Sequence, residues 1–359
     1  MRTGRMRLWI GMVLVLSLVA AACGGGDPAE TGQDGNGGDG AGSDIQVGIA
    51  FDVGGLGDKS FNDAAFRGLQ QAIDDGVVAK DSTKYIEPNQ SGSNRDDNVV
   101  NLADLGYNLV AAIGFAFSEG IDEIAGDYPD TDFAVVDGFA QDAPNVSNLT
   151  FKAEEGSFLV GAAAALKSET GTIGFLGGQR GTGLIEAFEA GFEAGAREVD
   201  PDIEILVEYI GDSTQAFVDP TRGEALSEKM YDAGADVIYH AAGQSGLGLL
   251  KAAAAQQKLA IGVDSDQSLT ATPEQQQYIL TSMLKRVDTA VFDVIQQVAD
   301  DEFQSGTQVF GLAEDGVGYA VNEYNDNEDL LSQDIQDELE KYKQEIIDGN
   351  ITVPTEPSG

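Results

Sequence analysis

Short apolar runs alternate with amphipathic segments from Asp44 to the end of the chain. Continuous apolar runs between turn residues indicate buried strands, whereas apolar positions three and four apart indicate helices. The predicted strands are 46–52, 84–88, 109–114, 132–137, 172–177, 203–210, 236–240, 259–264, 279–282, 308–312 and 317–321. The predicted helices are 61–74, 94–105, 119–126, 154–168, 184–198, 221–233, 246–257, 285–301 and 329–348. This alternation predicts parallel sheets flanked by helices, and so many strands favour two lobes over one sheet.

The first strand, loop and helix form the stretch around which we expect the site to be built. Residues 47–51 are an apolar run, and a glycine-rich loop follows over 54–57. Ser60 and Asp63 have the spacing of a capping box, which predicts that a helix starts near Phe61. In parallel α/β sheets, ligands bind at this end of the strands.

Residues 1–23 have the pattern of a secretory signal peptide, with a basic start, an apolar middle and small residues before Cys23. This is the only cysteine, and its place resembles that of a bacterial lipobox, with Ala20 where leucine is usual. We expect Cys23 to carry a lipid; the alternative is an ordinary cleavage site with an incidental cysteine. Residues 24–43 are rich in glycine and aspartate, which predicts a flexible tether spanning about 25 Å. The folded part is therefore expected to be held at a cell membrane, outside the cytoplasm.

The chain is strongly acidic, with 20 Lys and Arg against 61 Asp and Glu and a net charge of −41 in 359 residues. This charge disfavours nucleic acid and free nucleotides as partners, and is compatible with a neutral or cationic small ligand. A solvated acidic surface suited to a salty habitat is the simpler explanation. His240 is the only histidine and ends a strand, so we expect a packed side chain, with no metal and no cofactor.

Several blocks match a known family in order. Segment 54–62 resembles the opening signature of the basic membrane protein family, the PnrA-like nucleoside-binding lipoproteins of ABC uptake systems. The other matching blocks are 133–138, 151–161, 171–178, 236–248, 261–267 and 281–288. The resemblance spans roughly 46–350, and collinear blocks are far more specific than any single motif.

The resemblance implies an α/β type I periplasmic binding protein fold, with two doubly wound parallel-sheet lobes, a ligand cleft and three hinge crossings. We map the N-lobe to 44–150 plus 268–304 and the C-lobe to 151–267 plus 305–350, followed by a tail over 351–359. The crossings are expected near Thr150, Ser268 and Ser305. The implied function is a monomeric, extracytoplasmic binding protein, not an enzyme, that delivers purine nucleosides to ABC permease subunits.

The base of a nucleoside needs aromatic faces and a hydrogen-bonding edge. Phe61 and Phe217 are the expected stacking residues, and Asn62 and Asp137 the expected contacts to the base edge. Phe217 could instead be part of the core. Asp58, in the same signature as Phe61, is included in the expected site.

The ribose needs an acceptor for its hydroxyl groups. Asp264 follows the strand 259–263 and suits this role, Lys285 is expected to donate to ribose oxygens and to keep Asp264 ionised, and Gly243 allows close backbone approach. The alternative for Asp264 and Lys285 is a structural ion pair across the hinge. Two other functions stay open. One is a receptor for a sugar-like or signalling ligand. The other, less favoured, is a metal-dependent nucleoside hydrolase, suggested by Asp264 and Asp266, which would need a denser carboxylate cluster than Asp52 and Asp58 offer at the opening strand.

Overall fold

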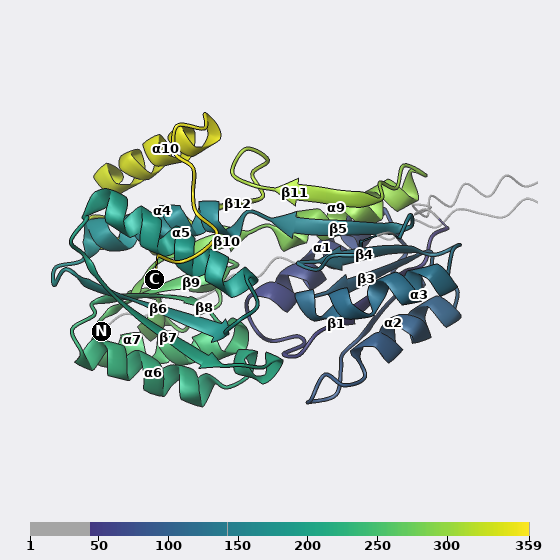
Figure 1. The fold of residues 1–359 in the computed structure, drawn as a ribbon, viewed down its shortest axis with the longest axis horizontal. Helices are drawn as coiled ribbons and strands as arrows, with labels where there is room; N and C mark the ends of the chain where they lie inside the picture. The colour runs from purple at the N-terminus through teal and green to yellow at the C-terminus, as the bar shows by residue number, and fades with distance from the viewer. Residues whose placement is uncertain (1–43, 142, 359) are drawn as a thin grey trace, which may run out of the picture. The chain divides into compact units, whose positions relative to one another are not determined.

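The computed structural model describes residues 44–141 and 143–358. Two six-stranded sheets make up its framework (Figure 1). Cys23 and the predicted tether 24–43 lie outside the described residues. Among the helices that are described, none has both the length and the apolar content to cross a membrane.

The first sheet, which defines the N-lobe, has the order β11-β5-β4-β3-β1-β2, with all neighbours parallel. Its strands are β1 (Val47–Phe51), β2 (Thr83–Ile86), β3 (Leu109–Ile113), β4 (Asp132–Val136), β5 (Val146–Phe151) and β11 (Gly306–Phe310). Its helices are α1 (Phe61–Asp74), α2 (Arg95–Asp104), α3 (Ile121–Asp127) and α9 (Val287–Ala299). Strand β11 lies beside β5, although residues 152–305 separate them in sequence (Figure 1).

The second sheet, which defines the C-lobe, has the order β12-β10-β9-β8-β6-β7, with only β12 antiparallel to its neighbour. Its strands are β6 (Thr172–Gln179), β7 (Glu204–Gly211), β8 (Val237–Ala241), β9 (Leu259–Asp264), β10 (Ile279–Lys285) and β12 (Val317–Tyr319). The remaining helices are α4 (Ala153–Lys167), α5 (Leu184–Val199), α6 (Pro220–Asp232), α7 (Leu247–Gln256), α8 (Pro273–Gln276) and α10 (Gln333–Ile347). The predicted two-sheet α/β architecture is confirmed.

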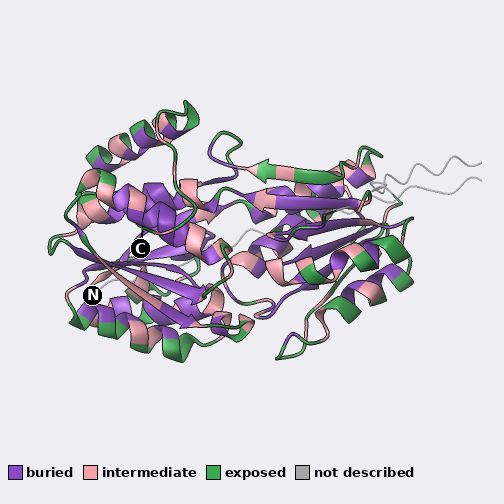
Figure 2. Ribbon diagram, in the orientation of Figure 1, coloured by how far each residue is buried: buried purple, intermediate pink, exposed green. Residues whose placement is uncertain are grey.

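Alternation along the strands explains why helices cover both faces of each sheet. In β1, Ile49 and Phe51 pack into the cluster that contains Leu69 of α1, whereas Ala50 packs with Leu102 of α2 on the other face. Successive side chains of a strand point to opposite faces, and both faces here are apolar. Figure 2 accordingly shows buried residues along the strands and on the sheet-facing sides of the helices, with exposed residues on their outer sides.

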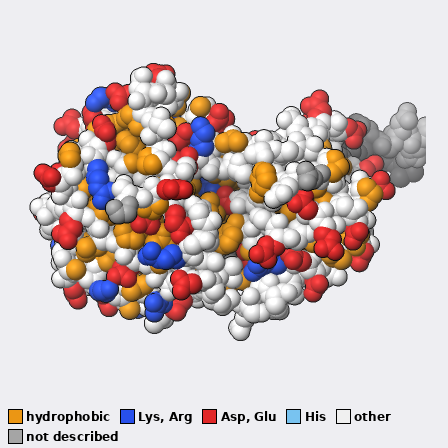
Figure 3. Space-filling view, viewed as in Figure 1, with side chains coloured by type: hydrophobic (Ala, Val, Ile, Leu, Met, Phe, Trp, Pro, Cys, Tyr) orange, Lys and Arg blue, Asp and Glu red, His pale blue; other side chains and the backbone are white. Residues whose placement is uncertain are grey.

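Acidic side chains are spread over the face seen in Figure 3, with fewer basic side chains between them. Their dispersal over the surface agrees with the solvated acidic surface predicted from the net charge of −41. The charge therefore needs no polyionic partner to explain it.

Two predicted lobe boundaries are wrong. Strand β10, assigned to the N-lobe within 268–304, pairs with β9 in the C-lobe sheet, and β11, assigned to the C-lobe within 305–350, pairs with β5 in the N-lobe sheet. The chain therefore crosses between the sheets at Arg286 and between Phe310 and Val317, later than predicted. A local sequence pattern predicts where a strand lies, but it does not predict which sheet the strand joins, because that depends on pairing with residues far away in the sequence. The first crossing follows β5, next to the predicted Thr150.

Candidate functional site

A cavity lies between the two lobes, at the carboxyl ends of strands from both sheets. Asp52, Gly114 and Asp137 follow β1, β3 and β4 and line it from the N-lobe, while Asp264 and Lys285 end β9 and β10 on the other side. About 660 Å³ of space not filled by atoms lies there, open mouth included. Binding at this edge is the rule for open α/β sheets.

The structure brings all the predicted ligand-binding residues together around this cavity. They are Asp58, Phe61, Asn62, Asp137, Phe217, Gly243, Asp264 and Lys285. Their contacts with a ligand remain predictions, but their convergence from both lobes gives one site for which these predictions can be tested.

Lys285 forms the charged end of the cavity. Its side chain is 1% exposed and is ion-paired with Asp137. The sequence analysis expected Lys285 to donate to the ligand and to keep Asp264 ionised, with a structural ion pair to Asp264 as the alternative. The ammonium group also lies 5.2 Å from the ring centroid of Phe61 and 5.3 Å from that of Phe188. Both rings attract the positive charge of the lysine through cation–π interactions. Lys285 thus joins a buried carboxylate to the aromatic wall.

Asp264 is a buried carboxylate held from the opposite lobe. The Ser60 hydroxyl donates to one oxygen of Asp264, and the other oxygen has no hydrogen bond from any described residue. Burial raises the pKa of Asp264 to about 6, although the positive charge of Lys285 opposes this shift. The prediction that Lys285 favours the ionised form therefore holds in direction, but burial outweighs it.

Asp137 and Asp264 both adopt left-handed backbone conformations, with φ of 59° and 62°. Such conformations are uncommon outside glycine and cluster at functional sites. Asp137 directly follows β4 and Asp264 ends β9, so both stand at the carboxyl end of their strands. A free carboxylate oxygen remains on each residue among the described contacts, facing a cavity that both residues line.

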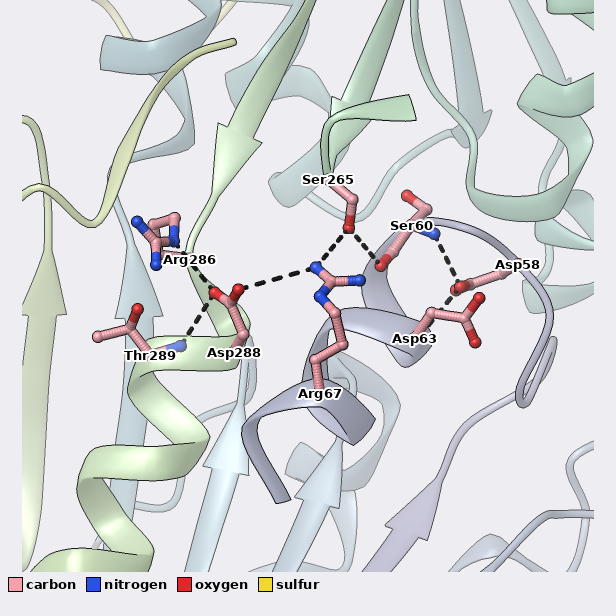
Figure 4. Close-up of polar contacts among 8 residues, drawn as sticks. All are labelled: Asp58, Ser60, Asp63, Arg67, Ser265, Arg286, Asp288 and Thr289. Atoms are coloured by element: carbon pink, nitrogen blue, oxygen red, sulfur yellow. Dashed lines mark hydrogen bonds and ion pairs between the residues drawn. The ribbon is translucent and has the colours of Figure 1, made fainter. Parts of the chain in front are cut away.

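Asp58 organises the glycine loop and the start of α1. Its carboxylate accepts hydrogen bonds from the backbone N–H groups of Ser60, Asn62 and Asp63 at 2.9, 2.8 and 3.1 Å. Figure 4 shows Asp58 beside Ser60 and Asp63. The predicted capping box is therefore wrong: the Ser60 side chain makes no cap and turns to Asp264 instead. Asp58 completes the helix start and also orients Asn62, whose Nδ2 donates to it at 3.0 Å.

Asn62 presents an unsatisfied acceptor. Its Oδ1 is buried and has no hydrogen-bond partner among the described residues, while the residue lines the cavity. A buried polar atom without a partner costs about 1–3 kcal/mol, so a ligand donor at this point would relieve that cost.

The aromatic side of the cavity contains the expected pair and one further ring. Phe61 and Phe217 are both partly buried and line the space. Phe115, which the sequence analysis missed, also lines it and meets Phe217 edge to face with centroids 6.3 Å apart. Gly243 lies against Phe217, and its φ of 53° is a left-handed conformation that favours glycine. Phe217 is thus a cavity residue rather than part of the closed core.

Other lining residues also escaped the sequence analysis. Leu184, Ile185 and Phe188 come from the first turns of α5, and Asp52 was considered only for hydrolysis. The signal that could have found Phe115 is its position just after β3, because the rule used for β1 applies to each parallel strand. No local pattern distinguishes the α5 residues from ordinary core positions.

Contacts between the lobes continue beside the cavity (Figure 4). Arg67 of α1 donates to the Ser265 hydroxyl at 2.9 Å, and that hydroxyl donates to the Ser60 carbonyl at 3.1 Å. Asp288 of α9 lies 3.8 Å from Arg67. The loop after β9 is thereby fastened to the start of α1, next to the Ser60–Asp264 contact.

Two features that could suggest an anion-binding loop and a catalytic histidine are instead satisfied by contacts within the protein. The glycine-rich loop before α5 directs the N–H groups of Gly181 and Gly183 at the Glu186 carboxylate, at 2.5 and 2.8 Å, so its anion-binding position is filled. His240 is fully buried, as predicted, with Nε2 2.8 Å from Gln267 Oε1, and burial lowers its pKa to about 4. Over the described residues, no cluster of His, Cys, Asp and Glu is arranged to hold a metal ion.

Comparisons with known proteins agree on one group. The family model described as "ABC transporter substrate-binding protein PnrA-like" matches residues 45–356. The chain is 35% identical to the CD4+ T-cell-stimulating antigen of Listeria innocua, over 99% of this chain and all of that protein. It is 32% identical to the ABC transporter nucleoside-binding protein BmpA of Lactococcus lactis, over 87% and 90% of the two chains.

Solved structures support the same fold. An ABC transporter solute-binding protein from Aeropyrum pernix superposes with a TM-score of 0.73 and 28% identity, over 88% of this chain and 94% of that one. The predicted type I periplasmic binding protein fold is therefore confirmed.

Proposed function

The chain belongs to the PnrA-like family of ABC transporter substrate-binding proteins, and from this we propose that it binds purine nucleosides in the interlobe cavity and delivers them to a permease. Proteins of this family bind a solute and do not transform it. Extracytoplasmic binding proteins pass their ligand to permease subunits, and we propose the same partners here. The lipid anchor at Cys23 and the monomeric state remain predictions.

The observation that carries the proposal is that aromatic rings and buried carboxylates line one cavity together. Phe61, Phe115 and Phe217 offer faces and edges for a flat base, and stacking contributes about 1–3 kcal/mol per base. Asp137 and Asp264 offer acceptors for two neighbouring hydroxyl groups. A nucleoside has both parts in one molecule.

The ion pair modifies one proposed role. Asp137 is ion-paired with Lys285 and therefore lies at the same end of the cavity as Asp264. The negative charge of Asp137 helps to raise the pKa of Asp264. We therefore assign Asp137 to the ribose hydroxyls rather than to the base edge. Asn62, with its unsatisfied Oδ1, remains the proposed amide contact to the base.

Isothermal titration of the full chain tests this proposal, after unfolding and refolding to remove any carried-over ligand. We expect one-to-one binding of guanosine, inosine or adenosine, and no heat from free ribose or free base, since each lacks half of the contacts. Binding of sugars or amino acids alone would agree with a solute-binding function but would contradict the proposal that the ligand is a nucleoside. Release of free base from inosine would support the hydrolase instead.

A further inference from the structure

We propose that the Arg95–Asp52 ion pair sets the base preference of the cavity, so that 6-oxopurine nucleosides, guanosine first, bind more tightly than adenosine. The inference rests on the proposed nucleoside function and goes further by naming the class of base and a residue that acts on it from outside the cavity lining. Arg95 is a positioning residue, because its effect passes through Asp52.

The pair is built into the wall of the cavity. Arg95 is the first residue of α2, and its Nη2 lies 3.0 Å from Oδ1 of Asp52, the residue after β1. The backbone N–H of Val53 donates to the same oxygen at 2.7 Å. No described residue donates to Oδ2, and Asp52 lines the cavity, so one oxygen is fixed behind the wall and the other is left for a ligand.

The guanidinium group packs against the loop before α2. Its Nη2 lies so close to Gly92 that a side chain there would overlap it, and Arg95 Nε is buried without a hydrogen-bond partner among the described residues. Close packing with an unsatisfied donor indicates that the contact with Asp52, rather than the best hydrogen bonding of Arg95, determines where the side chain lies.

The topology places Asp52 away from the ribose end. Asp52 follows β1 and Asp137 follows β4, with β3 between them. Two strand spacings separate these carboxylates by about 10 Å along the sheet edge. Phe115, which follows β3, lies on the aromatic side. A nucleoside whose hydroxyls reach Asp137 and Asp264 therefore extends its base toward Asp52.

An ionised carboxylate only accepts hydrogen bonds, and this decides which base edge suits it. Guanine presents N1–H and N2–H side by side, and both can donate to the one free oxygen, Oδ2 of Asp52. Hypoxanthine presents N1–H alone. Adenine presents the N1 lone pair, which repels a carboxylate, beside its N6 amino group. A well-matched pair discriminates by roughly tenfold to a hundredfold.

The charges around Asp52 explain why Arg95 is needed. Burial raises the pKa of Asp52, and Asp96 on α2 raises it further, whereas Arg95 and the Val53 N–H lower it. Asp58, on the loop that follows, is a second carboxylate on the cavity lining. Without Arg95, the carboxyl group would hold a proton nearer neutral pH, and its O–H would donate to adenine N1.

The test is titration of guanosine, inosine and adenosine into the full chain, as wild type and as Arg95→Met, from pH 6 to pH 8. We expect wild type to favour guanosine over adenosine by roughly tenfold or more, with little change across this range. In Arg95→Met the ratio of guanosine affinity to adenosine affinity should fall toward one or below one at pH 6. This ratio should recover as the pH rises and Asp52 ionises. Arg95→Lys should restore the preference, because it restores the charge.

A matched control and a second variant complete the test. Arg197→Met removes an arginine from another ion pair, 2.8 Å from Glu193 on α5, and should leave the ratio unchanged. If Arg95→Met does not fold, Asp52→Asn makes the same test, since its neutral amide should favour adenosine at every pH. If the wild type binds nucleosides without preferring guanosine, this inference alone is overturned. The same holds if Arg95→Met loses affinity equally for all three nucleosides at every pH. A wild type that binds no nucleoside overturns the proposed function as well.

Discussion

Asp264 shows how the site opposes the stability of the ligand-free protein. It is a buried carboxylate in a left-handed backbone conformation, and its pKa is raised to about 6 from an ordinary 3.8. The folded state thus binds a proton on Asp264 more readily than the unfolded state. The contribution of Asp264 to stability is greatest when it is protonated, and declines as the pH rises from about 4 through about 6.

We therefore predict that Asp264→Asn stabilises the ligand-free protein at pH 8. The gain in the free energy of unfolding should approach about 3 kcal/mol at pH 8 and should nearly vanish at pH 4, because at low pH both side chains are neutral. Asparagine also tolerates the left-handed backbone. Urea unfolding at the two pH values measures this difference.

The same variant should lose nucleoside affinity, so that stability and binding change in opposite directions. Asp212→Asn, at an exposed position after β7, is the control and should change neither. A wild type that is as stable as Asp264→Asn at pH 8 would contradict the assignment of a buried, destabilising charge to this position.

At the scale of elements, the closest packing joins α4 to α5. A Cβ on Gly161 would overlap the Phe192 carbonyl, one on Gly191 the Glu154 carbonyl, and one on Gly195 the Phe158 carbonyl. The two helices approach so closely because small residues face each other on both. This contact matters for the site, since the first turns of α5 line the cavity.

We predict that Gly195→Ala destabilises the protein by roughly 1–3 kcal/mol, because the added methyl group meets a backbone atom and the helices must separate. Gly126→Ala in α3 is the matched control. A Cβ there meets nothing within 4 Å, so removing a helical glycine should be neutral or stabilising by up to about 1 kcal/mol. Thermal or urea unfolding compares the two, and equal effects would contradict the close-packed crossing.

The elements themselves were largely predictable, because apolar periodicity is local. Strand β5 was missed: its sequence Val-Ser-Asn-Leu-Thr-Phe mixes polar residues into a buried strand. The structure explains their burial, since the Asn148 side chain accepts from the N–H of Ala140 at 2.8 Å and donates to its carbonyl at 2.9 Å. A polar residue that is satisfied by the backbone of the preceding loop carries no strand signal of its own.

The site was predictable where residues follow strands or belong to the matching blocks. Asp264 and Lys285 were found in this way, but the partner of Lys285 was not, because Asp137 reaches it from the other sheet. Phe188 was missed for a related reason: it lies on the buried face of a helix, where lining a cavity and packing in a core give the same sequence pattern.

At the scale of the whole molecule, the two lobes meet at the cavity and along contacts beside it. The Ser60–Asp264 bond, the Arg67–Ser265 bond and the Lys285–Asp137 pair all join segments of different lobes. Binding a ligand between the lobes and holding the lobes together therefore depend on the same loops. This arrangement is what lobe closure on a nucleoside would require.

The structure of the protein crystallised with guanosine tests the central claim most directly. We predict the base between Phe61 and Phe217, the ribose hydroxyls on Asp137 and Asp264, and the N1–H and N2–H edge toward Asp52. Guanosine bound elsewhere, or bound in the cavity with its ribose at Asp52 and its base at Lys285, would contradict the account.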